Sequence, residues 1–128
     1  MKAYLAGIST YMENEEIEIR YRIYSGDKLV VEKKEFQKYR KPLVVSHFAL
    51  ISLLRELRKM SSEEVEIVIH DAALNEQIRG TSTTKNQDVL KAVSLVKKEM
   101  EKLTAKLTIT DVTANFEAKT NWDQEVSF

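Results

Sequence analysis

An acidic side chain at the end of an apolar run is the residue of this sequence best placed for chemistry. The run Val65–Ile69 predicts a buried strand, and His70 and Asp71 follow it directly. In α/β proteins, strand ends hold side chains rigidly beside a loop that leaves them reachable, and chemistry is commonly placed there. Asp71 could act as an acid, a base or a metal ligand if other segments supply partners for it.

The same aspartate also has a structural interpretation. Asp is a favoured N-cap, its charge suits the start of a helix, and a helix can begin at Ala72. His70 and Asp71 could share one transition metal, because imidazole and carboxylate both bind Zn or Mn. Adjacent strand residues point to opposite faces, which argues against this metal pair. The sequence therefore favours the helix cap.

Two further side chains could bind a ligand, and both are better explained by packing. His47 falls on the apolar stripe of a predicted helix with Leu43, Leu50 and Leu54, so we expect a buried, hydrogen-bonded histidine. Trp122 lies in the last ten residues, and we expect a core or interface aromatic rather than a platform for stacked bases.

The densest basic stretch precedes that predicted helix and carries interleaved aromatic residues, Phe36 and Tyr39. Cations can hold a phosphate backbone while aromatic rings stack on bases or sugars, although the same pattern also occurs on an ordinary solvated strand end. The candidate nucleic-acid-binding residues are Lys33, Lys34, Lys38, Arg40 and Lys41.

Composition limits the classes of function. A chain of 128 residues with 43% hydrophobic content suits one domain over residues 1–128. Twenty basic and twenty acidic residues leave no net charge to attract nucleic acid or an anionic membrane, so any such binding must be local. Cysteine is absent, and no run reaches the roughly 20 apolar residues of a membrane span, so we expect a cytoplasmic protein. Neither a glycine-rich phosphate loop nor a Gly-x-Ser-x-Gly elbow is present, and nucleophilic catalysis is unsupported.

Hydrophobic periodicity predicts the elements that must position these residues. The clearest signal is the alternation of Ile17, Ile19, Tyr21 and Ile23 with charged residues, which is typical of a strand with one wet face. A helix should run from Pro42 to about Met60. The full predicted order is strands over 2–9, 16–23 and 29–36, the helix, a strand over 65–69, a helix over 89–103 and a strand over 107–112. Beyond residue 113 the periodicity is weak, and either a packed helix or a loose tail would fit.

This order predicts an α/β fold with a five-stranded mixed sheet. Strands joined by tight turns are antiparallel, whereas strand–helix–strand connections are right-handed crossovers that make neighbouring strands parallel. Three antiparallel strands followed by two parallel ones, with helices packed on the sheet, is the expected architecture.

Four segments, taken in order, resemble the ribonuclease H family. Tyr4–Ser9 resembles its first strand, which ends in Asp-Gly, and Phe48–Leu54 resembles the helix that its Glu begins. Ile67–Asp71 is similar to its fourth strand with Thr-Asp-Ser, and Lys85–Leu90 is similar to the Lys-Asn-x-x-Leu opening of a later helix. The resemblance covers nearly the whole chain and implies a ribonuclease H-like fold.

The resemblance also implies a site that has lost its acids. The family uses four carboxylates to hold two Mg or Mn ions about 4 Å apart, because neutral groups cannot hold two dications so close together. Its first Asp falls on Ala6 and its Glu on Ser46, whereas the fourth-strand Asp is retained as Asp71. The last acid falls on Thr120-Asn121 or, with a shift of two residues, on Asp123.

Three functions therefore remain open. The favoured one is a catalytically inactive ribonuclease H-like module, with no cofactor, that binds an RNA/DNA hybrid weakly through residues 33–41 or binds a protein partner. The second is a Mg- or Mn-dependent ribonuclease H-type endonuclease with a displaced acid set of Asp71, Asp111 and Asp123. The third is a protein-interaction scaffold, for instance a homodimer. None of them involves a membrane.

Overall fold

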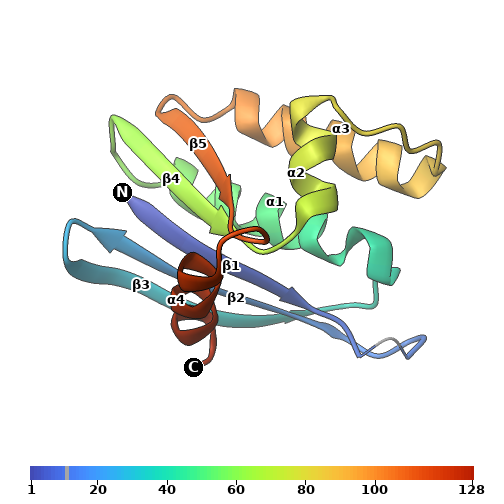
Figure 1. The fold of residues 1–128 in the computed structure, drawn as a ribbon, viewed down its shortest axis with the longest axis horizontal. Coiled ribbons are helices and arrows are strands. Elements are labelled where there is room, and N and C mark those ends of the chain that lie inside the picture. Colours follow the sequence, from blue (N-terminus) through green and yellow to red (C-terminus); the bar gives the residue numbers. More distant parts are fainter. Residues whose placement is uncertain (11) are drawn as a thin grey trace.

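A central five-stranded sheet organises the protein (Figure 1). The computed structural model describes residues 1–10 and 12–128. In spatial order the strands are β3, β2, β1, β4 and β5. Their bounds are β1 Lys2–Ile8, β2 Ile17–Ser25, β3 Lys28–Gln37, β4 Glu64–Ile69 and β5 Lys106–Asp111.

The pairing of the strands confirms the predicted mixed sheet. β1 is antiparallel to β2, and β2 is antiparallel to β3. β1 is parallel to β4, and β4 is parallel to β5. The carboxyl ends of β1, β4 and β5 therefore meet at one edge of the sheet, and side chains that follow these strands are brought together there.

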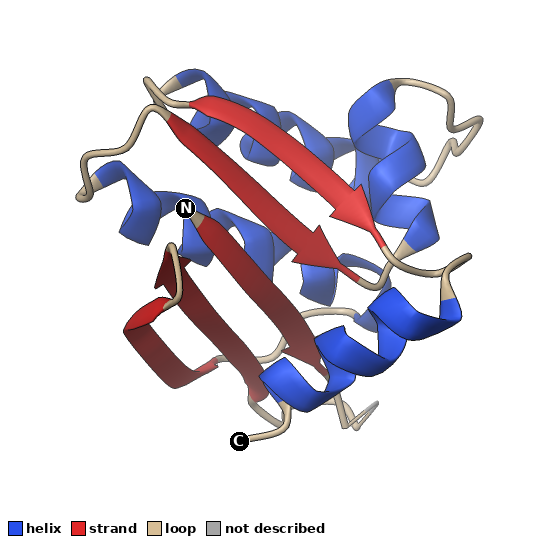
Figure 2. Cartoon of the chain, turned by 60° about the vertical axis from the view of Figure 1, so that its left-hand side comes forward, coloured by secondary structure: helices blue, strands red, loops and turns tan. Residues whose placement is uncertain are grey.

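Helices cover both faces of this sheet. They are the short 3-10 helix η1 Pro42–Val44 and the α-helices α1 Val45–Arg58, α2 Ala72–Arg79, α3 Gln87–Glu101 and α4 Phe116–Val126. In Figure 2, α4 crosses one face of the sheet, while α1 and α3 lie behind the opposite face. None of the helices in residues 1–10 and 12–128 is long and apolar enough to cross a membrane.

The alternation along the strands divides the core into two layers. Tyr21, Leu5 and Ile67 are among the strand residues that pack with α1 on one side of the sheet. Tyr4 and Val68, their neighbours in sequence, face α4 on the other side. Both faces of β1 and β4 are thus buried, which explains their nearly continuous apolar sequences.

A glycine sets the distance between β1 and α1. A Cβ atom on Gly7 would lie 3.1 Å from the Cβ of Ala49 and 3.2 Å from the backbone oxygen of Val45. These distances are too short for an unstrained side chain, so glycine lets the first turn of α1 lie directly on the end of β1.

The weakly periodic tail is a helix packed on the sheet. Asn115 caps α4, because its side-chain oxygen accepts a hydrogen bond from the backbone N–H of Ala118 at 3.0 Å. Val126 is the buried residue of this helix, whereas Phe116 is exposed. A helix that buries so narrow a stripe gives little hydrophobic periodicity, so the sequence did not distinguish a packed helix from a loose tail here.

Candidate functional site

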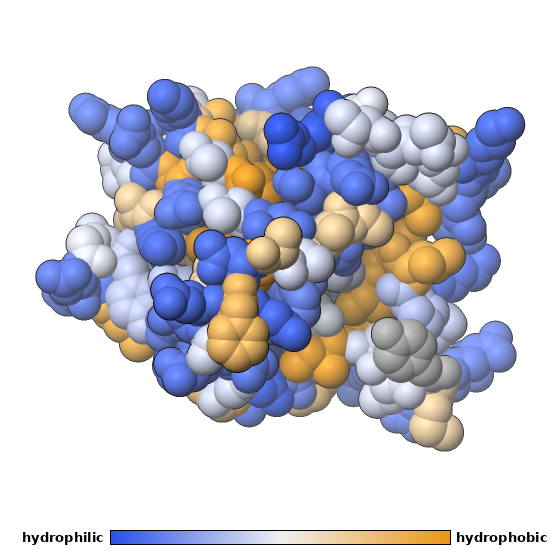
Figure 3. Space-filling view, viewed as in Figure 1, coloured by the Kyte–Doolittle hydropathy of each residue, from blue (hydrophilic) through white to orange (hydrophobic). Residues whose placement is uncertain are grey.

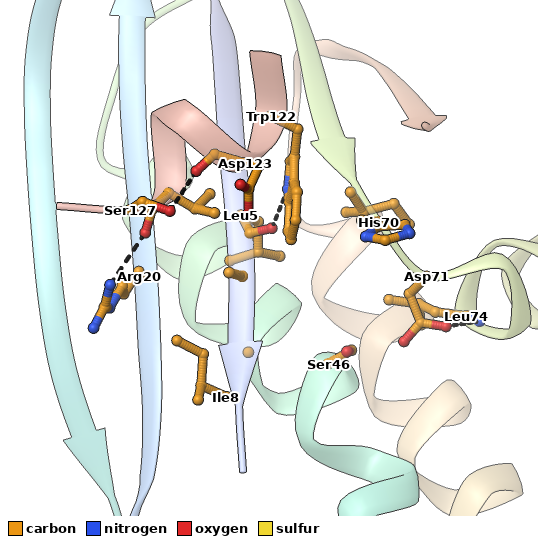
Figure 4. Close-up of a pocket in the computed structure, with 14 residues that line it drawn as sticks. Leu5, Ile8, Arg20, Ser46, His70, Asp71, Leu74, Trp122, Asp123 and Ser127 are labelled. Atoms are coloured by element: carbon orange, nitrogen blue, oxygen red, sulfur yellow. Dashed lines mark hydrogen bonds between the residues drawn. The ribbon is translucent and has the colours of Figure 1, made fainter. Parts of the chain in front are cut away.

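A cavity of about 220 Å³ opens at the carboxyl ends of β1 and β4 (Figure 4). The end of β1, the start of α1, the β4–α2 junction and α4 all contribute to its lining. Apolar surface gathers beside α4, over this part of a mostly hydrophilic face (Figure 3). Its polar lining residues are Arg20, Ser46, His70, Asp71, Asp123 and Ser127.

The positions that the resemblance assigns to the ribonuclease H acids meet at this cavity when the last acid is placed on Asp123. Ala6, Ser46, Asp71 and Asp123 all line it. Thr120 and Asn121, the other assignment of the last acid, are not among its lining residues. The four lining positions come from four separate segments. Two of the four are neutral, and one of those is the methyl group of a buried alanine.

The carboxylate of Asp71 caps α2. Its Oδ1 accepts a hydrogen bond from the backbone N–H of Leu74 at 2.9 Å, and its own backbone is extended, with φ −159° and ψ 94°. The helix-cap interpretation of Asp71 is confirmed. At the other end of α2, Gly80 adopts a left-handed conformation with φ 80°, which is a common way to end a helix.

Asp111 holds two loops together at the same edge of the sheet. Its Oδ1 accepts from the backbone N–H of Asp71 at 3.0 Å and from the hydroxyl of Thr113 at 2.8 Å. A weaker bond of 3.3 Å comes from the backbone N–H of Thr113. This oxygen therefore connects the β4–α2 loop to the β5–α4 loop, and its hydrogen bonds are made with groups of the protein itself.

Trp122 fills the side of the cavity that α4 covers. Its indole N–H donates to the backbone oxygen of Leu5 at 2.8 Å. Its ring meets the ring of His70 edge to face, with centroids 5.1 Å apart and planes at 76°. The expectation of a packed aromatic is confirmed, while the contact with His70 could not be predicted because 52 residues separate the pair.

The residue before Trp122 is engaged elsewhere. The side-chain amide of Asn121 donates to the hydroxyl of Tyr4 at 3.2 Å, in the layer between α4 and the sheet. In the view of Figure 4, the Trp122 ring stands between Asp123 on α4 and Asp71 at the start of α2. The two carboxylates thus approach the cavity from different sides.

The residues at this cavity do not fit a pair of divalent cations. Within residues 1–10 and 12–128, no group of three or more Asp, Glu or His side chains is arranged to hold a metal ion. Hard cations such as Mg²⁺ and Mn²⁺ are bound through several oxygen ligands, and two of them require concentrated negative charge. Here Asp71 is used as a helix cap and Asp111 as a loop connector.

His47 is a buried residue of α1, as its position on the apolar stripe predicts. Its side chain is 2% exposed, and its Nε2 lies 2.5 Å from Oε1 of Gln77 on α2. Burial lowers the pKa of His47 below its usual value, although the hydrogen bond with Gln77 and the charge of Asp71 oppose this. The histidine is therefore neutral at pH 7 and links α1 to α2.

The basic stretch from Lys33 to Lys41 does not form one surface. Lys33 pairs with Tyr21 across the sheet and lies on the α1 side, whereas Lys34 pairs with Arg20 on the α4 side. Alternation along β3 separates the two lysines. Lys38 follows β3 and is exposed.

The remaining cations of the stretch, Arg40 and Lys41, lie near the start of α1. The guanidinium carbon of Arg40 is 3.8 Å from the ring centroid of Phe48, and Lys41 forms a salt bridge of 2.8 Å with Asp88 on α3. Lys33 pairs with Glu35 at 3.5 Å. Lys33, Arg40 and Lys41 thus lie on the side of the sheet that α1 and α3 cover, each beside a specific partner.

Cations on α1 and α3 that were not selected from the sequence also lie on that side. A groove is lined by Arg55 on α1 and Lys98 on α3, by the C-cap residues of these helices, Lys59 and Lys102, and by Lys33 and Arg40. Their four-residue spacing within each helix is a signal that the sequence contains, because such residues share one face of a helix. That the two helices present these faces to the same groove depends on the tertiary structure.

Comparisons with known proteins agree with this architecture. No protein-family model and no curated protein matches the sequence. RNase H1 from the halophilic archaeon Halobacterium salinarum has a TM-score of 0.80 and 18% identity, covering 98% of this chain and 89% of that one. The N-terminal RNase H domain of a Mycobacterium tuberculosis protein has a TM-score of 0.76 and 15% identity, covering 98% and 93%.

A third similar structure is LC11-RNase H1 in complex with an RNA/DNA hybrid. It has a TM-score of 0.77 and 17% identity, and the alignment covers 98% of this chain and 92% of that one. The chain therefore has the ribonuclease H-like fold along nearly its whole length, and the predicted fold class is confirmed.

Proposed function

We propose that this protein is a catalytically inactive ribonuclease H-like module that binds nucleic acid. The observation that carries the proposal is the lining of the cavity at the ends of β1 and β4. Ala6 and Ser46 stand there at the positions of two acids, and Asp71 is engaged as the cap of α2. The scaffold is retained without the charge that the reaction needs.

The absence of catalysis follows from electrostatics. Two dications close together repel each other strongly, and only a cluster of anionic ligands offsets that repulsion. Asp71 and Asp123 together supply at most two negative charges, half of what the family's four carboxylates provide. We therefore expect neither tight binding of a metal pair nor metal-dependent hydrolysis.

Binding of nucleic acid is supported by the basic residues and by one structural neighbour. LC11-RNase H1 was solved with an RNA/DNA hybrid. Of the basic stretch, Lys33, Arg40 and Lys41 lie on the α1 side of the sheet, whereas Lys34 lies on the other side and Lys38 is exposed after β3. So few cations on one side favour modest affinity, since each phosphate contact adds only a limited, salt-sensitive contribution. We also propose a cytoplasmic location, which cell fractionation would test.

The decisive experiment for inactivity is a cleavage assay at enzyme excess. A labelled RNA/DNA hybrid is incubated with the protein and Mg²⁺ or Mn²⁺, with Asp71→Asn as the comparison. We expect no metal-dependent cleavage above the background of buffer alone. Cleavage that requires metal and disappears in Asp71→Asn would instead establish a nuclease with a displaced set of acids.

Binding is tested separately, by fluorescence anisotropy of labelled hybrid and labelled single strands at several salt concentrations. We expect saturable binding that weakens as salt rises. If no nucleic acid is bound even at low salt, the binding half of the proposal is wrong.

A further inference from the structure

The largest gathering of cations lies away from the cavity, in a groove between β3, α1 and α3. The groove has a volume of about 510 Å³ and is lined by the cations Lys33, Arg40, Arg55, Lys59, Lys98 and Lys102. At Arg40, Phe48 and Leu95 it continues into a second hollow of about 410 Å³, which Lys41 and Lys91 also line. We call the two hollows together the basic groove.

The basic groove is positively charged although the whole chain is neutral. Eight Lys and Arg side chains line it, against the four carboxylates Glu35, Glu56, Glu99 and Asp88. The excess is four positive charges, so the rest of the chain carries the opposite excess. The groove is thus the place where this neutral protein can attract a polyanion.

The cavity at the ends of β1 and β4 has the opposite character. Asp71 and Asp123 line it, and among the described residues Arg20 is the one Lys or Arg side chain that does so. A phosphate backbone is therefore attracted to the basic groove in preference to this cavity.

Arg40 is held at the junction of the two hollows. Its guanidinium group stacks on Phe48, and its Nε atom is buried without a hydrogen-bond partner in the described part of the chain. A buried guanidinium donor without an acceptor is costly, so an acceptor that bonds to this group recovers part of that cost.

Two lysines of α3 are available to a ligand at little cost. Lys91 and Lys98 are exposed, line the groove and form no salt bridge within residues 1–10 and 12–128. Most other cations of the groove already face a carboxylate, as Lys102 and Arg55 face Glu99. These two lysines can turn toward phosphates without breaking an existing ion pair.

The lining of the groove favours a single strand over a duplex. Because α1 and α3 pack directly against each other, the groove lies over their contact and is lined by side chains of both helices. The half-buried rings of Tyr39 and Phe48 and the exposed side chain of Leu95 line the groove together with the cations. Apolar and aromatic floors that receive bases, with basic rims that receive phosphates, are typical of single-strand binding.

We infer that the basic groove between β3, α1 and α3 binds single-stranded nucleic acid, with Lys91 and Lys98 contacting the phosphates and Arg40 at the centre. This inference rests on the proposed function and deepens it, because it names the surface and the kind of strand. The binding surface lies on the opposite side of the sheet from α4.

The test uses charge reversal on one helix with a matched control. Lys91→Glu/Lys98→Glu reverses both groove lysines, while Lys97→Glu/Lys119→Glu makes the same charge change at exposed positions outside the groove. Binding of labelled 12-nucleotide single strands, of RNA and of DNA, is measured by anisotropy, and thermal melting checks that both variants fold. We expect the groove variant to raise Kd at least about tenfold and the control by less than about threefold.

The salt dependence gives a second readout. With about four phosphate contacts, the slope of log K against log[salt] should be about −3, and it should become shallower in the groove variant by about one unit or more. Two outcomes would overturn the groove assignment and leave nucleic-acid binding intact. One is an equal loss of single-strand affinity in both variants, and the other is tighter binding of the hybrid than of single strands with no loss of affinity in the groove variant.

Two further outcomes would contradict nucleic-acid binding itself. If no nucleic acid binds to the wild-type protein, both this inference and the binding half of the proposed function are wrong. If an oligoglutamate peptide binds with the same dependence on Lys91 and Lys98 and no oligonucleotide does, the groove serves an acidic protein partner instead.

Discussion

Substitutions of Asp71 separate its two interpretations, helix cap and metal ligand. Asn is as good an N-cap as Asp, so Asp71→Asn keeps the acceptor for the N–H of Leu74 and loses only the charge near the helix start. Asp71→Ala removes the acceptor as well. We expect the asparagine variant to be nearly as stable as the wild type and the alanine variant to be clearly less stable.

The magnitudes follow from the hydrogen bond that the carboxylate of Asp71 accepts from the N–H of Leu74. Loss of an N-cap costs about 1 kcal/mol, with a range of about 0.5–2, and the interaction of the charge with the helix dipole adds about 0.3–1 kcal/mol. The alanine variant should therefore lose between about 1 and 3 kcal/mol, and the asparagine variant less than about 1. With a urea m-value of about 2 kcal/mol per molar, a loss of 2 kcal/mol lowers the unfolding midpoint by about 1 M.

Urea unfolding with and without MnCl₂ is the assay. A metal bound at one hundred times its Kd would stabilise the folded protein by about 2.7 kcal/mol. We expect no such stabilisation in the wild type or in either variant. If Mn²⁺ stabilises the wild type and Asp71→Asn abolishes that gain, Asp71 is a metal ligand. The argument that too few acids remain to bind a metal is then refuted.

Three further predictions concern the surroundings of the site and the groove. Because burial lowers the pKa of His47, unfolding takes up a proton below about pH 6.5, and stability decreases as the pH falls, by at most about 1.4 kcal/mol per pH unit. Urea unfolding at several pH values should show this decrease in the wild type but not in His47→Gln. Identical pH slopes of the two proteins would contradict the prediction. Burial would raise the pKa of Glu99, but its hydrogen bonds and ion pairs with the surrounding cations lower it. Glu99→Gln should therefore lower the free energy of unfolding by about 1 kcal/mol in dilute buffer and by little in 1 M NaCl. A loss that does not depend on salt would show that Glu99 acts through packing. Trp122→Phe removes the indole donor to Leu5 and should cost about 0.5–1.5 kcal/mol, and an unchanged melting temperature would show that this bond adds nothing.

The strands and the long helices were predictable because their periodicity is local. Ile17, Ile19, Tyr21 and Ile23 are all fully buried on the face that alternation indicates. The cap at Asp71 was predictable for the same reason, since a cap and its helix are adjacent in the sequence. The helix after Asn115 was not, because α4 buries too narrow a stripe for hydrophobic periodicity to reveal it.

The candidate binding residues show the limit of linear reasoning. Lys33 and Lys34 are neighbours in the sequence, yet a strand sends them to opposite faces of the sheet. Lys91 and Lys98 on α3 lie far along the chain from Arg40, yet they line the same groove. A patch of charge is a property of a surface, and only packing decides which segments share one.

The sequence by itself determined that Ala6 and Ser46, which the resemblance assigns to two of the four acid positions, bring no negative charge, because a side chain without a carboxyl group cannot supply it in any fold. It also determined the order of strands and helices, through spacings that each segment carries within itself. Only the tertiary structure decided that the carboxylate oxygens of Asp71 and Asp111 hold backbone groups and that α1 and α3 present their cations to one groove. Those outcomes depend on contacts between distant segments, whose geometry is fixed by the packing of the whole core.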